Sequence, residues 1–531
     1  MTDDLMKLKA ALANGRVGRR DFMVGALGAG LTLAAADSLF VSSALAQTPK
    51  KGGHLVLGMN GGSATDTLDP ASFTNDVDFT TGRLWGEALV AYSPTGSAPV
   101  PVLAESYEGT NKAKTWVFKL RKGVKFSNGK TLTADDVVAT LKRHSDENSK
   151  SGALGIMRGI QEIKADGPNT VVIELETANA DLPFLMADYH LIIQPNGGLD
   201  NPTAGIGTGP YIIDVAEHGI RYLAKKNPDY WNDELGHVDS VEILVINDLT
   251  ARMSALQSNK VHMINRVDPK TISFLKRSKN ISIENTAGRG HYVFLMHADK
   301  EPFSNLHLRL AMKYAIDREV LVKQILRGYG TVGNDMPINT AYPYFPDSIE
   351  QRTYDPDKAK FHYKKSGHDG AVLLRTSNAA FNGAEDAAVL YQQQAAVAGI
   401  QIEVKREPAD GYWSSVWNVQ PFSTSYWSGR QTQDQMYSVA YYSKADWNDT
   451  KWFRPAFDKL LLEARAELNG ERRKELYTEM GTMVRDDGGT IAPMFNDFID
   501  AISTNVGGYV RDPNGMLSNS FAPLRTWLKD A

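Results

Sequence analysis

Strand-like and helix-like segments alternate along almost the whole chain, and this alternation limits its possible folds more than any other feature. The hydrophobic periods of Ala371–Arg375, Asp386–Ala398 and Ile400–Lys405 predict a strand, a helix and a second strand. Leu308–Leu326 predicts one amphipathic helix. The chain has 531 residues, which is too long for a single hydrophobic core. The sequence therefore predicts an α/β fold with two or three lobes.

Local signals mark several further elements. His54–Gly58 is an apolar run typical of a strand, and the turn-rich loop Asn60–Pro70 follows it. Thr133 predicts a helix N-cap, because acidic residues and then an apolar face come after it. Other predicted strands are Trp116–Leu120, Thr170–Leu175 and Val241–Ile246, and other predicted helices are Thr250–Gln257 and Glu471–Asp487.

The N-terminal segment has the order of an export signal. Arg19 and Arg20 precede the charge-free, Ala- and Gly-rich run Phe22–Ala36, and Ala44-Leu45-Ala46 is a small-x-small cleavage site. The run is too short for a transmembrane helix. We therefore predict a cleaved signal peptide over residues 1–46, of the twin-arginine type although Gly18 stands where Ser or Thr is common. General secretion, a membrane anchor and a buried helix are the alternatives.

Charge and cysteine content exclude several classes of protein. The formal net charge is −4, too small to indicate a nucleic-acid partner or an anionic membrane surface. The chain has no cysteine, which excludes disulfides, thiolate metal sites, a cysteine nucleophile and a lipidated N-terminal cysteine. Together with the export signal, this predicts a periplasmic protein that no lipid anchors.

No motif for catalysis, cofactor binding or metal binding stands out. The zinc-protease, phosphate-loop and nucleophile-elbow patterns are absent, and the 11 histidines have no metal-like spacing. Gly205-Ile-Gly-Thr-Gly209 leads into a strand-like run, so no helix N-terminus follows it to bind a pyrophosphate. We predict a binding protein with no enzymatic activity, no cofactor and no resident metal.

Four segments resemble the extracellular solute-binding proteins that serve dipeptide, oligopeptide and nickel ABC importers (family 5). Trp116–Val137, with its Lys-Gly-Val-Lys-Phe-Ser-Asn-Gly turn region, matches the family's best-known signature. The others follow in the family's order: Gly207–Tyr211 with Asn227–Trp231, Pro302-Phe303 with Arg309–Arg318, and Tyr354–Lys360.

The resemblance implies a two-lobed fold of three domains that closes over its ligand by hinge motion. Domain I would comprise residues 47–83, 205–285 and 506–531. Domain II would be an insertion, residues 84–204, and domain III would span residues 286–505. The implied function is capture of a small, peptide-like solute for membrane permease subunits, with the binding protein a monomer. A ligand-presenting sensory module and a carrier of a metal chelate are the alternatives.

One position departs from the pattern of the peptide-binding members. Their Trp-x-x-Asp segment places a carboxylate against the ligand's ammonium group, and the matching segment here is Trp427-Ser428-Gly429-Arg430. A guanidinium only donates hydrogen bonds and suits a carboxylate, sulfonate or phosphate. Arg430 therefore predicts an anionic or N-blocked solute, unless Asp434 pairs with Arg430 and neutralises it.

Other candidate ligand residues come from the predicted cleft surfaces. They are Trp427 and Gly429 beside Arg430, Ser63, Thr65 and Asp66 in the loop after the first strand, Arg289 and His291 near the crossover to domain III, and Tyr189 in the inserted domain.

Overall fold

The computed structural model describes residues 49–530, except Thr74, residues 95–98, 147–148, Lys150, Arg158, residues 409–411 and Asp446. The predicted signal peptide, residues 1–46, lies outside the described residues. Within the described part of the chain, no helix has both the length and the apolar character needed to cross a membrane.

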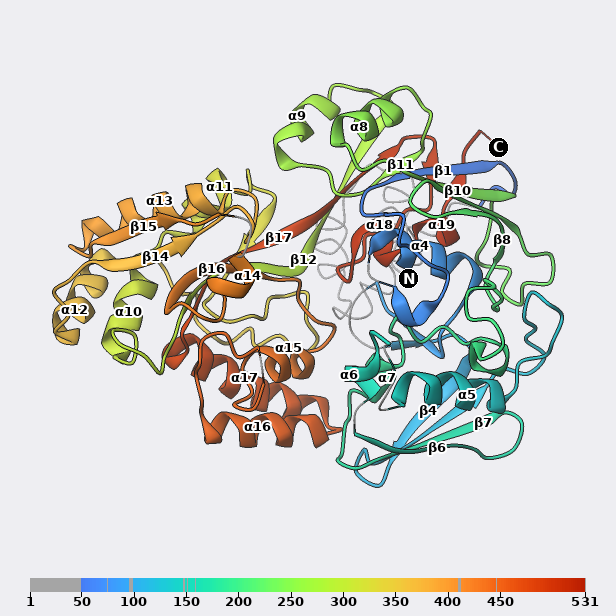
Figure 1. Ribbon diagram of the computed structural model, residues 1–531, viewed down its shortest axis with the longest axis horizontal. Coiled ribbons are helices and arrows are strands. Elements are labelled where there is room, and N and C mark those ends of the chain that lie inside the picture. Colours follow the sequence, from blue (N-terminus) through green and yellow to red (C-terminus); the bar gives the residue numbers. More distant parts are fainter. Residues whose placement is uncertain are drawn as a thin grey trace, which may run out of the picture.

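One large sheet runs through both lobes of the molecule (Figure 1). Its strand order is β15-β14-β16-β12-β17-β11-β1-β10-β9-β8, and β13 pairs with β17 beside this path. The strands in chain order are β1 (His54–Met59), β8 (Tyr211–Glu217), β9 (Arg221–Lys226), β10 (Ser240–Val245), β11 (Met263–Ile264), β12 (Ile281–Met296), β13 (Gly330–Val332), β14 (Val372–Thr376), β15 (Ile402–Arg406), β16 (Phe422–Trp427) and β17 (Thr490–Ser503).

The strands β12 and β17 connect the two lobes. They pair antiparallel from Ile281–Ser503 to Leu295–Thr490, and Figure 1 shows both passing from one lobe into the other. Their register shifts between Ala287 and His291, which marks an irregularity in the middle of the pair. The predicted boundary at residues 285 and 286 falls inside β12, so the chain enters the second lobe within a continuous strand.

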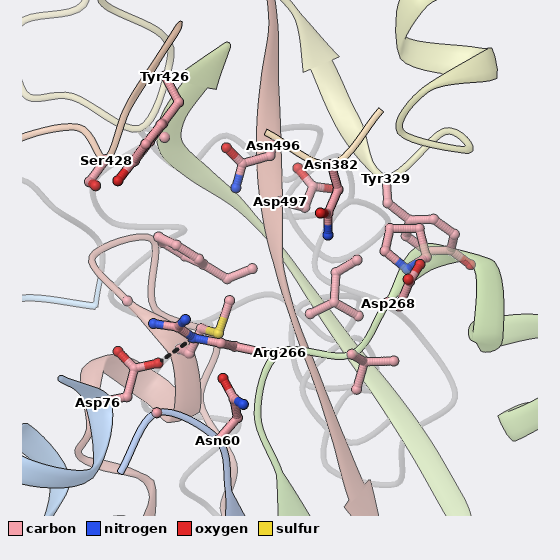
Figure 2. Close-up of a pocket in the computed structure, with 18 of the residues that line it drawn as sticks. Asn60, Asp76, Arg266, Asp268, Tyr329, Asn382, Tyr426, Ser428, Asn496 and Asp497 are labelled. Carbon is pink, nitrogen blue, oxygen red and sulfur yellow. Dashed lines mark hydrogen bonds and ion pairs between the residues drawn. The ribbon is translucent and has the colours of Figure 1, made fainter. Parts of the chain in front are cut away.

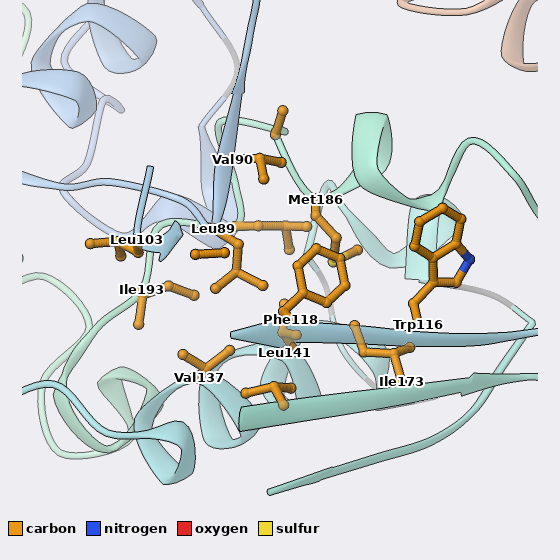
Figure 3. Close-up of a cluster of buried hydrophobic side chains, with 14 of the residues drawn as sticks. Leu89, Val90, Leu103, Trp116, Phe118, Val137, Leu141, Ile173, Met186 and Ile193 are labelled. Carbon is orange, nitrogen blue, oxygen red and sulfur yellow. The ribbon is translucent and has the colours of Figure 1, made fainter. Parts of the chain in front are cut away.

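A separate four-stranded sheet lies within residues 104–175, in the order β4-β5-β7-β6. Its buried side chains alternate along β5 and β7, and they pack against Val137 and Leu141 of α5 around Phe118 (Figure 3). As predicted, Thr133 begins α5, and its backbone N–H donates to the Asp136 side chain at 3.1 Å. The elements are β4 (Ala104–Thr110), β5 (Thr115–Leu120), α5 (Ala134–Ser145), β6 (Ile160–Ala165) and β7 (Thr170–Leu175).

The prediction of one helix over Leu308–Leu326 is wrong, because two helices occupy this segment. They are α10 (Leu306–Tyr314) and α11 (Arg318–Gln324). Asp317 begins α11 as an N-cap, and its side chain accepts a hydrogen bond from the Val320 N–H at 3.0 Å. Leu308, Met312 and Leu321 are buried on both sides of the break. The apolar period therefore continues across it and conceals it.

The other elements cover the sheet or connect its strands. The helices are α4 (Asp76–Trp85), α6 (Leu154–Met157), α7 (Leu182–Leu185), α8 (Leu249–Gln257), α9 (Ile272–Leu275), α12 (Pro356–Ser366), α13 (Ala384–Val397), α14 (Tyr412–Ser415), α15 (Gln433–Ala440), α16 (Pro455–Ala466), α17 (Gly470–Asp487), α18 (Met516–Asn519) and α19 (Ala522–Arg525). Two short pairs complete the set, β2 (Val90–Tyr92) with β3 (Pro99–Pro101) and β18 (Val506–Gly507) with β19 (Trp527–Leu528).

The lobes also touch away from the crossover strands. Arg473 of α17 forms an ion pair with Asp181, at the start of α7, with 2.7 Å between Nη2 and Oδ1. Both side chains are buried. The Ala180 N–H donates to the Arg465 carbonyl at 2.7 Å beside this pair. These contacts bring the segment with Ala180 and Asp181 against α16 and α17.

Candidate functional site: the cleft between the lobes

A cleft of about 1450 Å³ lies between the lobes and is lined by both of them. One wall includes α4 and the start of the loop after β1, and the other includes the end of β16 and the start of α13. Asn496–Ile499 of β17 also line it where the crossover strand passes between the lobes. Figure 2 shows polar side chains from these elements pointing into one space. Such a cleft can remove a ligand from water while polar groups orient it.

The helix α4 presents one face to the cleft. Asn75 is its N-cap, and its side-chain oxygen accepts from the N–H groups of Val77 and Asp78 at 2.9 and 3.2 Å. Asp76, Phe79 and Arg83 follow at helical spacing, so they share a face, and all three line the cleft. Arg83 is buried, and its Nη2 donates to the Ala187 carbonyl at 3.1 Å.

Tyr189 lies in the cleft wall, stacked on this helix. Its ring centroid is 3.7 Å from that of Phe79, with 30° between the ring planes. Burial raises the pKa of the Tyr189 hydroxyl, and the charge of Asp188 raises it further. The hydroxyl is therefore neutral at physiological pH and can donate a hydrogen bond to a ligand.

The segment Trp427–Arg430 begins where β16 ends. Trp427 pairs across the sheet with His291, is buried, and lines the cleft together with Ser428. The Arg430 guanidinium carbon lies 5.7 Å from the centre of the Trp427 ring. Nη1 of Arg430 donates to the Gly429 carbonyl at 2.6 Å, and the backbone N–H donates to the Tyr342 hydroxyl at 3.0 Å.

Arg430 is half-buried and has no carboxylate partner among the residues that the structure describes. Burial lowers the pKa of Arg430, and electrostatic interactions with Tyr342 and Tyr189 act in the opposite direction. The charge of Arg430 in turn acts on the pKa of Tyr189, which connects this loop electrostatically with the opposite wall. Arg430 is therefore a partly desolvated cation next to Trp427, Ser428 and Gln431, which line the cleft, although Arg430 is not itself among the lining residues.

Asp434 does not neutralise Arg430. Its two carboxylate oxygens accept from Nε of Arg465 at 3.0 and 3.1 Å, and the side chain is buried inside α15 and α16. Burial raises the pKa of Asp434 to about 6. The prediction that Asp434 lies in the ligand cleft is corrected, because its partner stands 31 residues further along the chain on a neighbouring helix.

Gly429 and Arg289 are packed against each other behind the cleft surface. Gly429 has φ +82°, and a Cβ there would lie 2.6 Å from the Cβ of Arg289. Nε and Nη2 of Arg289 donate to the Ala341 carbonyl at 3.0 and 2.7 Å. Its Nη1 donates to Gln431 at 2.8 Å and also to Asn514. Arg289 thus fixes the loop that carries Arg430 and ties it to the C-terminal segment, without lining the cleft itself.

His291 is part of β12 within the sheet, and it does not line the cleft. The side chain is fully buried, and its ring packs 4.9 Å from that of Phe495. Nδ1 lies 3.2 Å from the Arg289 carbonyl and can donate to it. Burial lowers the pKa of His291 to about 4, so the ring is neutral at physiological pH. The prediction that His291 contacts the ligand is therefore wrong, because its ring packs inside the protein against Phe495.

The loop Asn60–Pro70 lines the cleft, as predicted, but through other residues than the predicted ones. Asp66 accepts from the Ser63 N–H at 3.0 Å and from Asn75 at 2.9 Å, which folds the loop back onto the start of α4. Ser63 and Thr65 are exposed, and their hydroxyl oxygens lie 2.8 Å apart. None of these three residues lines the cleft, whereas Asn60 and Gly61 at the start of the loop do.

One ion pair in the cleft was not predicted from the sequence. Nε of Arg266 donates to Oδ2 of Asp76 at 2.9 Å, and both side chains line the cleft (Figure 2). The two residues are 190 positions apart, and no local pattern indicates either of them. The structure also brings no three His, Cys, Asp or Glu side chains together as a metal site within its described part.

Comparisons with known proteins cover most of the chain. A model described as bacterial extracellular solute-binding proteins, family 5 Middle, matches residues 98–449. The dipeptide-binding protein of Escherichia coli K12 is 25% identical over 464 residues, which are 80% of this chain and 86% of that protein. The glutathione-binding protein GsiB of Shigella flexneri is 26% identical over 490 residues, 87% of this chain and 93% of that protein.

The solved structures include the same fold. HbpA2 from Haemophilus parasuis superposes with a TM-score of 0.81 at 20% identity, over 90% of this chain and 100% of that chain. The likeness extends through both lobes and the crossover strands.

Proposed function

Because this chain belongs to the bacterial extracellular solute-binding proteins of family 5, the substrate-binding components of ABC importers, we propose that its cleft captures a small, peptide-like solute and that Arg430 binds an anionic group of that solute. Two of the relatives are named for dipeptides and glutathione, both of which carry carboxylates and peptide bonds. Peptide-like solutes of this kind fit the size and mixed polarity of the cleft.

The observation that supports the role of Arg430 is its lack of a counter-charge among the described residues. A partly buried cation is costly unless a hydrogen-bonded anion compensates it. The guanidinium uses one donor on the Gly429 carbonyl, which leaves other N–H groups for a carboxylate, sulfonate or phosphate. A free ammonium at the same place would be repelled.

The aromatic groups around Arg430 complete this proposed subsite. The Trp427 ring packs against the guanidinium, and Tyr189, which lines the cleft, influences the pKa of Arg430. Tyr189 can donate one more hydrogen bond to an anion that arrives between the lobes. Closure of the lobes would then dehydrate the charged pair and strengthen it.

The setting of this function follows from the family and the sequence. We propose that the mature protein acts as a monomer in the periplasm and delivers its solute to ABC permease subunits in the inner membrane. We also propose that the three predicted domains are its moving units, with domains I and III as the two jaws of the cleft. No enzymatic step is part of this function, in keeping with relatives that are named as binding proteins.

A thermal-shift screen of the mature protein tests the proposal. Free dipeptides, N-acetylated dipeptides, N-acylated amino acids, opine-like conjugates and nickel chelates are compared on wild type and Arg430→Ala. Binding to the folded form raises the melting temperature. We expect an anionic, N-blocked compound to give a shift that Arg430→Ala loses. Equal shifts from free and N-acetylated dipeptides, retained in the variant, would contradict the role of Arg430.

A further inference from the structure

The ion pair of Asp76 and Arg266 leaves hydrogen-bonding capacity unused on both partners. Arg266 binds Oδ2 of Asp76 through Nε alone, and Asn265 Nδ2 donates to the same oxygen at 3.2 Å. In the described residues, no partner occupies Oδ1 of Asp76 or the two Nη groups of Arg266. The Arg266 side chain is 48% exposed and that of Asp76 is 23% exposed, so solvent in the cleft reaches both.

The backbone around Arg266 is held in an unusual conformation. Arg266 has φ 51°, a left-handed conformation that non-glycine residues rarely adopt. Arg252 is buried and donates to the carbonyls of Asn265 and Arg266, both at 3.3 Å. Asn265 is also buried and exchanges hydrogen bonds with the Asn60 backbone at 2.8 and 3.2 Å. The surrounding structure thus imposes the conformation that directs the Arg266 side chain into the cleft.

A free carboxylate oxygen and free guanidinium N–H groups lie side by side in this arrangement. An α-amino-acid head group carries the complementary pair, an ammonium and a carboxylate on one carbon. The ammonium can donate to Oδ1 of Asp76, and the carboxylate can accept two parallel hydrogen bonds from Arg266. A single cation or anion would satisfy only half of the site.

We propose that Asp76 and Arg266 bind a zwitterionic α-amino-acid head group of the transported solute. The inference rests on the proposed function and adds a second attachment point, on the wall opposite Arg430. The solute would carry an α-amino-acid head at one end and a separate anionic group, with no ammonium beside it, at the other. A γ-glutamyl amide with a terminal carboxylate has this chemistry.

Three matched probes test each half of the head group separately. γ-L-Glutamylglycine has the whole head, glutarylglycine lacks only its ammonium, and 4-aminobutanoylglycine lacks only its α-carboxylate. Their affinities are measured by isothermal titration calorimetry on wild type, Asp76→Asn and Arg266→Gln. Removal of either charged group from the probe is expected to weaken binding to wild type at least about tenfold.

The variants should abolish these preferences selectively. Asp76→Asn should bind γ-L-glutamylglycine and glutarylglycine equally, and Arg266→Gln should bind γ-L-glutamylglycine and 4-aminobutanoylglycine equally. Arg277→Gln is the control, because Arg277 is also exposed and does not line the cleft. It should keep the wild-type preferences.

Two results would overturn the inference. One is a uniform loss of affinity for all three probes in both variants, which is what a purely structural ion pair would produce. The other is failure of γ-L-glutamylglycine to bind wild type. Neither result bears on Arg430, because all three probes keep the distal carboxylate and the screen with N-acetylated dipeptides needs no amino-acid head.

Discussion

Single residues set the geometry of the Arg430 loop, and glycine at position 429 is required by its surroundings. The left-handed φ of Gly429 and its contact with Arg289 leave no room for a side chain. Trp427, the last residue of β16 before this loop, interacts with buried Asp449, which also accepts a hydrogen bond from the Trp417 indole at 3.0 Å. Both positions act on Arg430 through the loop that carries it.

Gly429→Ala should weaken solute binding as well as stability. The new methyl group would meet Arg289 and force the loop to move, and the left-handed backbone adds a cost of roughly 1–2 kcal/mol. Gly399→Ala is the matched control, since Gly399 has φ +78° with nothing within 4 Å of the added carbon. Urea unfolding and calorimetry should show a stability loss in both variants and an affinity loss only in Gly429→Ala. Unchanged affinity in Gly429→Ala would contradict this account of the loop.

Asp449 should make stability depend on pH. Burial raises its pKa to about 7, although the indoles of Trp417 and Trp427 lower it by donating hydrogen bonds. The folded protein then holds a proton that the unfolded chain releases near pH 3.8, so the free energy of unfolding falls as pH rises from about 4 to about 7.

The variant Asp449→Asn isolates this effect. Asparagine keeps an acceptor for the indoles and cannot titrate, so the stability of wild type should fall relative to the variant across that pH interval. Urea unfolding at several pH values measures the difference in the free energy of unfolding between wild type and variant. The titration of the other buried acids, Asp434 and Asp500, contributes equally to both proteins and cancels. A difference that does not change with pH would show that Asp449 has an ordinary pKa.

At the scale of elements, helix caps determine where the site-bearing segments begin. α15 starts directly after Arg430 and Gln431, and Thr432 is its N-cap. The Thr432 hydroxyl accepts from the Gln435 N–H at 3.2 Å, and the Gln435 side chain accepts from the Gln431 N–H at 3.0 Å. The cap therefore fixes the end of the loop at Gln431, and Arg289 holds the same residue through its side chain.

Thr432→Ala should lower stability by about 1 kcal/mol and also weaken solute binding. The control is Thr133→Ala, which removes the similar capping box of α5 in the inserted segment, away from the cleft. Chemical denaturation should give comparable losses in the two variants, and calorimetry should give an affinity change only for Thr432→Ala. The same affinity change in both variants would mean that general destabilisation, not the loop, weakens binding.

The elements that the sequence predicted well carry strong local signals. Thr170–Leu175 is the strand β7 as predicted, and the predicted N-cap Thr133 begins α5, because alternation and capping are properties of neighbouring residues. The break at Asp317 was missed since buried leucines continue the apolar period across it. Local sequence therefore determined the types of element better than their interruptions.

The site was only partly predictable for a related reason. Tyr189 and Trp427 do line the cleft, whereas Arg430, to which the resemblance to known sequences also pointed, is adjacent to lining residues and does not line the cleft itself. Asp434 was misplaced because its partner Arg465 comes from another helix. Asp76 and Arg266 were missed because the pair forms only when α4 meets the loop after β11. Contacts between distant segments leave no local pattern in the sequence.

For the whole molecule, the contact between α17 and the inserted segment should favour the form with the lobes together. Arg473 and Asp181 are buried as an ion pair, and removal of one partner leaves an unpaired buried charge. Arg473→Met should therefore shift the molecule toward an open form, increase its radius of gyration in small-angle X-ray scattering, and weaken solute binding.

The neighbouring variant Arg472→Met is the control. Arg472 is 49% exposed and pairs with Glu463 and Glu475 on the surface of the same region, where an ion pair contributes little. Its scattering curve and affinity should match those of wild type. An unchanged radius of gyration in Arg473→Met would show that the contact does not hold the lobes together.

The proposed binding of the solute's anionic group by Arg430 is tested most directly by the charge of the solute. The affinities of an N-acetylated dipeptide and of its uncharged C-terminal amide are measured by calorimetry on wild type and Arg430→Ala. Wild type should bind the carboxylate form at least about tenfold more tightly, and Arg430→Ala should bind the two forms alike. A preference for the carboxylate that survives in Arg430→Ala would mean that another group binds the anion.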